Sequence, residues 1–138
     1  DVANAIAPLG VKIAQHGITG TPLELMHRLI DAGIVKGNVG TNWQNIALEN
    51  MPADLVKKME GWTMEKYAAA VKAKTPEMSD KEIIGKNIKN AIKPFKQEIA
   101  NIDEEYKQKI YAASKKSALE FIEAFNGKGS GKVVKSFC

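Results

Sequence analysis

Two histidines are the side chains best suited to acid–base chemistry in this sequence. His16 and His27 are its two histidines, and an imidazole can give or take a proton near neutral pH. One acting as base and the other as acid could cleave RNA without a metal, so both are candidate catalytic residues. They are eleven residues apart and on different expected elements. The alternative roles are a cap at a helix C-terminus for His16 and a packed boundary position for His27.

A pair of similar turns could bind an anion. The stretches HGITGTPLEL (residues 16–25) and KGNVGTNWQN (residues 36–45) both read G-x-x-G-T-x-x-[E/Q]. Glycines just before a helix leave backbone N–H groups near the positive end of the helix dipole, which suits phosphate or carboxylate. The second turn has a lysine beside it. Its candidate anion-binding residues are Lys36, Gly37, Gly40 and Thr41.

The same turns could instead only begin helices. Thr21 and Glu24 have the spacing of a capping box, in which each side chain bonds the backbone of the other residue, and Thr41 and Gln44 repeat it. Glu24 would then occupy a donor and repel a phosphate, whereas neutral Gln44 would not. Neither turn continues as the G-K-[S/T] of a phosphate-binding P-loop. The second turn is therefore the better candidate for an anion.

The elements that must position these residues are expected to be helical. Apolar spacing predicts a helix over 22–32, a short helix from Thr41, one from Pro52 to near Gly61, and one that Thr63 caps. Ser79 and Glu82 have the spacing of a further capping box. Because no run alternates with period two, we expect an all-α fold: a single-domain helical bundle of about five to seven helices. Residues 1–126 would form the domain and residues 127–138 a flexible basic tail, in which Val133, Val134 and Phe137 form an apolar patch that could dock as an extended segment.

An apolar seam dominates the C-terminal half. Apolar residues recur every three or four positions from Ile84 to Ala113, which predicts one or two long helices with a kink at Pro94 and a fresh start near Asp103. The short N-terminal helices would pack on them. If they leave the seam uncovered, the seam would bind a partner protein, and the chain would be a non-enzymatic interaction or assembly module.

A run of lysines favours contact with a polyanion. The lysines at 86, 89, 93 and 96 step by three and four, so on one helix they would share a face opposite the apolar seam. The tail adds further lysines, and the candidate nucleic-acid-binding residues are Lys86, Lys89, Lys93, Lys96, Lys128 and Lys132. The leading hypothesis is a domain that binds RNA or DNA through backbone contacts, with cleavage as its enzymatic version. The alternative for the lysines themselves is an ordinary solvated helix face.

Composition excludes several classes of function. The chain has 138 residues, a net charge of +4 and one cysteine, Cys138, so we expect no internal disulfide, no metal site and no cofactor. No apolar run approaches the roughly 20 residues of a membrane span. The start at Asp1 rather than Met indicates a processed product or a piece of a longer chain. A toxin-like effector module acting in a cytoplasm would fit these features.

Overall fold

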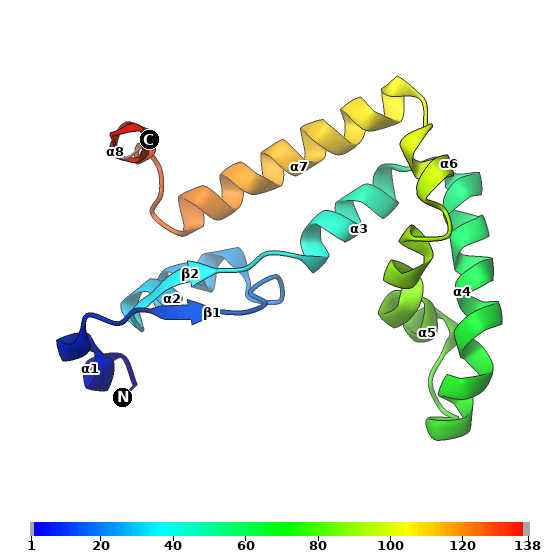
Figure 1. The fold of residues 1–138 in the computed structure, drawn as a ribbon, viewed down its shortest axis with the longest axis horizontal. Helices are drawn as coiled ribbons and strands as arrows, with labels where there is room; N and C mark the ends of the chain where they lie inside the picture. Colours follow the sequence, from blue (N-terminus) through cyan, green and yellow to red (C-terminus); the bar gives the residue numbers. More distant parts are fainter. Residues whose placement is uncertain (1, 137–138) are drawn as a thin grey trace. The chain divides into compact units, whose positions relative to one another are not determined.

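The protein is mostly helical but contains a small sheet. The computed structural model describes residues 2–136. It is 69% helical, with eight α-helices and a two-stranded parallel sheet among the described residues (Figure 1). The expected all-α class is therefore correct in that most of the chain is helical, but the parallel sheet means that the fold is not purely α. Two compact units can be distinguished. The first unit comprises the residues up to Asn45 and those from Ala112 onward, and the second comprises Ile46–Tyr111.

The first unit begins with a β-α-β segment. After α1 (Val2–Ile6) and a 3-10 turn (Ala7–Leu9), the strand β1 (Ile13–Gln15) leads through a 3-10 turn (Leu23–Leu25) and α2 (Met26–Asp31) into β2 (Ile34–Gly37). The two strands pair in parallel, which requires a crossover of this kind between them. The all-α prediction is wrong here because strands of three and four residues are too short to show alternation.

The first capping box that the sequence suggests is not formed. The 3-10 turn before α2 is capped by Pro22 without a side-chain hydrogen bond, so Glu24 lies one position too early to reach back. The Thr21 N–H donates instead to the carbonyl of Ile18 (2.9 Å). Thr21 therefore belongs to the turn after β1. The Glu24 carboxylate makes no capping hydrogen bond to the backbone N–H of Thr21.

Two longer helices complete the first unit. The helix α3 (Thr41–Asn50) follows β2 and contributes its first turn, and α7 (Glu104–Ala124) contributes its C-terminal half. Trp43 meets the Phe121 ring edge-on with 6.2 Å between ring centroids, and the Asn42 amide donates to the Ser117 hydroxyl (2.9 Å). The short helix α8 (Gly131–Lys135) lies beyond the end of α7, and Phe137 and Cys138 lie outside the described residues (Figure 1).

The second unit is helical and is built around α4. This helix (Ala53–Lys74) passes through Gly61 without a break, so the two helices expected on either side of that glycine are one. Thr63, expected to cap the second, is fully buried, and its hydroxyl donates to the Met59 carbonyl one turn earlier (2.7 Å). The short elements α5 (Asp80–Asn87), a 3-10 segment (Ile88–Ile92) and α6 (Lys96–Ala100) follow.

The apolar seam is the core of the second unit. Ile88, Ala91 and Ile102 are buried with Leu55 and Met59 of α4. The partly buried seam residues Ile84, Phe95, Ile99, Tyr106 and Ile110 pack against this cluster. The seam does not lie on one long helix, because the chain turns around Pro94 between the 3-10 segment and α6 and again before α7. These seam residues are thus covered within the second unit, whereas Ile92 is 46% exposed. The prediction that the seam binds a partner protein has no support.

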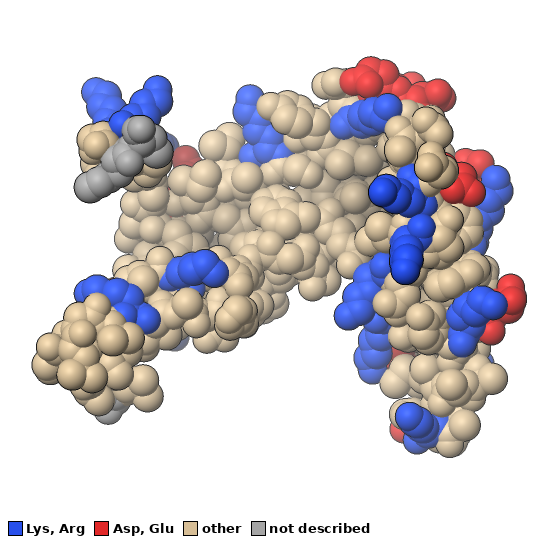
Figure 2. All heavy atoms as spheres, in the orientation of Figure 1, with Lys and Arg blue, Asp and Glu red and all other residues tan. Residues whose placement is uncertain are grey.

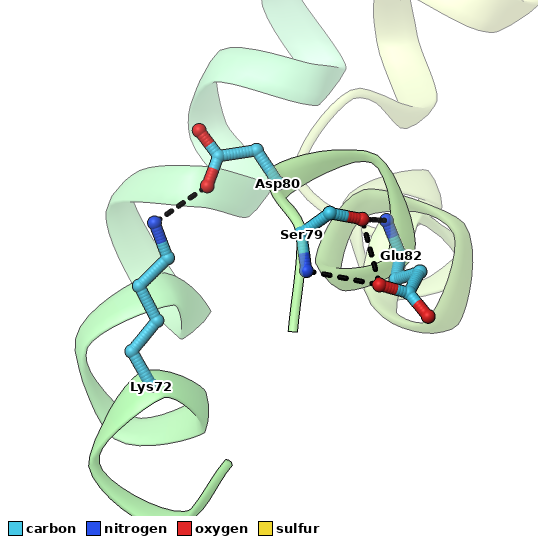
Figure 3. A network of polar contacts seen from close by, with 4 residues as sticks. All are labelled: Lys72, Ser79, Asp80 and Glu82. Carbon is cyan, nitrogen blue, oxygen red and sulfur yellow. Dashed lines mark hydrogen bonds and ion pairs between the residues drawn. The ribbon is translucent and has the colours of Figure 1, made fainter. Parts of the chain in front are cut away.

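The capping box at the start of α5 is confirmed. The Ser79 hydroxyl accepts from the Glu82 backbone N–H, and the Glu82 carboxylate accepts from the Ser79 backbone N–H (2.9 Å) and hydroxyl (2.7 Å) (Figure 3). Beside it, the Lys72 ammonium of α4 pairs with Asp80 at 2.6 Å. These contacts hold the turn between α4 and α5. Among the described residues, no helix is both long and apolar enough to cross a membrane.

Candidate anion-binding site

The two glycine turns lie at the same edge of the sheet. Because β1 and β2 are parallel, their carboxyl ends point the same way, and the turns 16–21 and 38–41 follow those ends directly. We call them the paired turns. The Asn38 N–H donates to the Gln15 carbonyl (3.1 Å), and the Ile18 N–H donates to the Asn38 carbonyl (3.0 Å). The backbone of Asn38 therefore ties one turn to the other.

The side chain of Asn38 brings together two residues that the sequence singled out separately. The Lys36 ammonium donates to Asn38 Oδ1 (2.5 Å), and Asn38 Nδ2 lies 3.0 Å from His16 Nδ1. Since an ammonium group can only donate, the carboxamide oxygen faces Lys36 and its NH₂ group faces the imidazole. In this arrangement His16 Nδ1 accepts the hydrogen bond from Asn38. A cation and an imidazole are thus held side by side at the exposed edge of the paired turns.

The glycines of the paired turns occupy their positions for different structural reasons. Gly17 has φ of 73°, a left-handed conformation that favours glycine. At Gly37 an added Cβ would lie 2.5 Å from Ile18 Cδ1 and 3.2 Å from Phe125 Cζ, so the buried side chain of Ile18 would have to shift to admit it. Gly20 and Gly40 face open space. Of the two predicted anion-binding glycines, Gly37 is thus also needed for close packing, whereas Gly40 borders a space that a ligand could enter.

An apolar cavity adjoins the paired turns. It has a volume of about 200 Å³ and is lined by Ile18, Gly37, Val39, Phe121, Ile122 and Phe125. Ile18 belongs to the first turn and Val39 to the second, while the three last-named residues come from the C-terminal end of α7 and the residue after it. The turns are therefore polar on one side and packed against apolar side chains on another.

The structure separates the other predicted site residues. His27 is an exposed residue of α2, whereas His16 follows β1 and contacts Asn38. Lys86 lies in α5, Lys89 in the 3-10 segment, Lys93 at the end of that segment and Lys96 at the start of α6. The four lysines therefore do not form a stripe on one helix. In the tail, Lys128 pairs with Glu123 (3.0 Å), and Lys132 lies in α8.

The surface charge agrees with this separation. On the visible face, the basic side chains over the helices of the second unit form separate groups with acidic groups among them (Figure 2). Within residues 2–136, no three histidine, cysteine, aspartate or glutamate side chains gather closely enough to hold a metal ion.

Sequence reasoning missed Asn38 and the strands that place it. The signal was present: each glycine turn directly follows a short run containing β-branched residues, VKIAQ and GIVKG. Two such runs separated by a helix are typical of a parallel β-α-β unit. In that context the repeated turns are neighbours in space, which their repetition alone did not establish.

A parallel β-α-β unit with glycine turns at the carboxyl ends of its strands is an arrangement that α/β enzymes use to hold phosphorylated ligands. The family model of class-II fructose-bisphosphate aldolase matches residues 1–130. The chain therefore belongs to the class-II fructose-bisphosphate aldolase family. No curated protein and no solved structure matches the chain.

This membership corrects the functional predictions from sequence. The family is one of metabolic enzymes whose name points to a sugar phosphate. Binding or cleavage of RNA or DNA, a toxin-like effector role and a non-enzymatic assembly role are therefore wrong. The error came from reading Lys86–Lys96 as one helix face, when the chain changes direction between these lysines.

Proposed function

We propose that this chain takes part in the aldol cleavage of a fructose bisphosphate, and that the paired turns bind a phosphate group of that substrate. One observation carries the proposal. Lys36 and His16 meet through Asn38 at the carboxyl ends of two parallel strands, between two glycine turns. Family membership supplies the substrate class.

The chemistry of the paired turns suits a phosphate group. Lys36 supplies a positive charge, and charge-assisted hydrogen bonds to phosphate are stronger than neutral ones. The helix α3 begins at Thr41, so its first backbone N–H groups and the positive end of its dipole lie next to the second turn. Gly40 leaves open space at that point. Because the Thr21–Glu24 capping box is not formed, the Glu24 carboxylate does not occupy a backbone donor there, although Glu24 stays in the first turn of the 3-10 helix.

Anchoring a phosphate would serve the reaction by orientation. Aldol cleavage breaks one carbon–carbon bond of the six-carbon bisphosphate. A hydroxyl proton leaves, the electron pair of the broken bond passes to the other fragment, and that fragment takes up a proton, giving two three-carbon phosphates. A fixed phosphate places the breaking bond relative to the groups that move these protons. The part that we propose for the paired turns is to hold the substrate in this way.

Backbone NMR with a sugar-phosphate titration tests the proposal. Adding fructose 1,6-bisphosphate to the protein should shift the amide signals of residues 16–21 and 36–42, while fructose without phosphate should leave them in place. Asn38→Ala releases both Lys36 and His16. The loss of two hydrogen bonds of ordinary strength predicts binding weaker by about 5- to 30-fold.

Asn90→Ala is the matched control, because Asn90 is an exposed asparagine of the second unit that lies among the lysines Lys86–Lys96. It should bind the sugar bisphosphate as the unmodified protein does. Shifts confined to the amides of residues 81–96, or equal affinity in Asn38→Ala, would contradict a phosphate site at the paired turns.

A further inference from the structure

The C-terminal helix α8 presents an apolar pair to solvent. Val133 and Val134 are 60% and 57% exposed, on a helix of only five residues. An isolated helix of that length is not stable in water by itself and normally depends on packing. The pair lies between Lys132 and Lys135, and the stretch 127–136 contains three lysines and no acidic residue.

The apolar cavity beside the paired turns is open to a side chain of this kind. Ile122, one of its lining residues, is itself 48% exposed. Pockets for small organic ligands usually hold about 300–1,000 Å³, whereas this cavity holds about 200 Å³. Its size and apolar lining suit one or two aliphatic side chains better than a free ligand.

The connection between α7 and α8 permits the pair to reach the cavity. Phe125 lines the cavity, and Val133 follows it by eight residues. Eight residues span at most about 26–29 Å when extended, and a short tether keeps the local concentration of the valines high. The connection turns at Asn126 (φ 54°) and Gly129 (φ 84°), two sites where the chain can change direction. Figure 1 shows α8 beyond this loop.

We propose that α8 is a strap that closes over the paired turns when the sugar bisphosphate binds. Val133 and Val134 enter the apolar cavity, and Lys132 and Lys135 come to face the bound phosphate. The apolar contacts hold the strap in place, and the charges make closure depend on the ligand, because the lysines find a partner there only when the anion is present. This inference rests on the proposed phosphate site.

Methyl-labelled NMR of the full chain tests the strap. On addition of fructose 1,6-bisphosphate, the Val133 and Val134 methyl groups should show new contacts to the rings of Phe121 and Phe125. The double variant Val133→Asp/Val134→Asp should bind the sugar bisphosphate about three- to tenfold more weakly, since the burial of the two valines on closure is partly offset by the cost of ordering the tail. Val2→Asp changes another exposed valine (69%) on a five-residue helix of the same unit, and this variant should bind normally.

The outcomes separate the two proposals. If the amides of the paired turns shift but the valine methyl groups make no ring contacts and the double variant binds normally, the phosphate site stands and the strap is overturned. If the ring contacts are equally strong without the sugar bisphosphate, α8 is a permanent cover, and closure by the ligand is overturned. If the unmodified protein does not bind the sugar bisphosphate, both proposals fall.

Discussion

Gly37 lies in the candidate site, but close packing against its neighbours explains why this residue is a glycine. The sequence predicts that it belongs to an anion-binding turn, and in the structure it packs against Ile18 and Phe125. Lys36 and His16 could also be selected from sequence because their chemistry is evident from residue type. Asn38 could not, because three of its four hydrogen bonds join it to Gln15, His16 and Ile18, which only the parallel strands bring near.

Replacing Gly37 with alanine should destabilise the protein. The new Cβ would lie 2.5 Å from Ile18 Cδ1, and overpacking of this kind typically costs about 1–3 kcal/mol. Urea unfolding followed by Trp43 fluorescence, with Trp62 replaced by Phe in both variants, measures the loss, since Trp43 packs on Phe121 near this point. Gly40→Ala is the control, because its added Cβ meets nothing within 4 Å. Equal stability of the two variants would show that Gly37 is not held by packing.

At the scale of elements, two capping-box patterns in this chain have opposite outcomes. Ser79 has an extended backbone (φ −67°, ψ 155°) and stands three residues before Glu82, as the reciprocal bonds require. Thr21 is followed by Pro22, which itself becomes the cap, and the Thr21 N–H is already bonded in the turn. The spacing of residue types is identical, so sequence alone could not separate them. The prediction of one or two long helices over residues 84–113 is wrong for a similar reason. Apolar residues continue to recur every three or four positions across the turns that separate the shorter helices.

The Ser79–Glu82 box should make stability depend on pH. The side-chain and backbone hydrogen bonds from Ser79 lower the pKa of Glu82 below its ordinary value of 4.5. The folded protein therefore binds this proton more weakly than the unfolded chain. The stabilisation from the box is present above pH 4.5 and is lost as the pH falls through the lowered pKa.

Ser79→Ala should raise the pKa of Glu82 toward its ordinary value, as followed by carboxyl-carbon NMR. The stability difference between the variant and the unmodified protein should shrink as the pH falls below 4.5. Lys86→Met removes only a smaller lowering influence and should move this pKa less. A pKa that stays low in Ser79→Ala would contradict the role of the cap.

At the scale of the whole molecule, the chain has two cores rather than one. Met59 is fully buried in the second unit and Met26 in the first. Composition indicated a protein large enough for a core, and periodicity identified the seam residues that fill the second one. Neither could show that the residues up to Asn45 join those after Tyr111, because that pairing depends on contacts between distant segments such as Trp43 and Phe121. The single domain over 1–126 stays a prediction.

Met59→Ala should loosen the second unit selectively. Truncating a buried methionine usually costs about 2–5 kcal/mol, and this loss should appear as faster hydrogen exchange of amides in α4 and α5. The amides of Ile18 and Asn38 in the first unit should keep their protection. Met26→Ala is the reciprocal variant, with the opposite pattern expected. An equal loss of protection in both units for either variant would show that they unfold together.

The helix α4 passes through Gly61 without a break, so replacing this glycine can raise the thermal stability of the protein. Glycine inside a helix costs about 0.5–1 kcal/mol relative to alanine, and a Cβ added at Gly61 would meet nothing within 4 Å. Gly61→Ala should therefore raise the melting temperature by several degrees in a calorimetric scan, with the sugar-bisphosphate affinity unchanged. A melting temperature that does not rise would show that this position has a use for glycine beyond the helix itself. Gly61 is therefore a suitable first position for engineering a more thermostable variant, because it lies outside the paired turns.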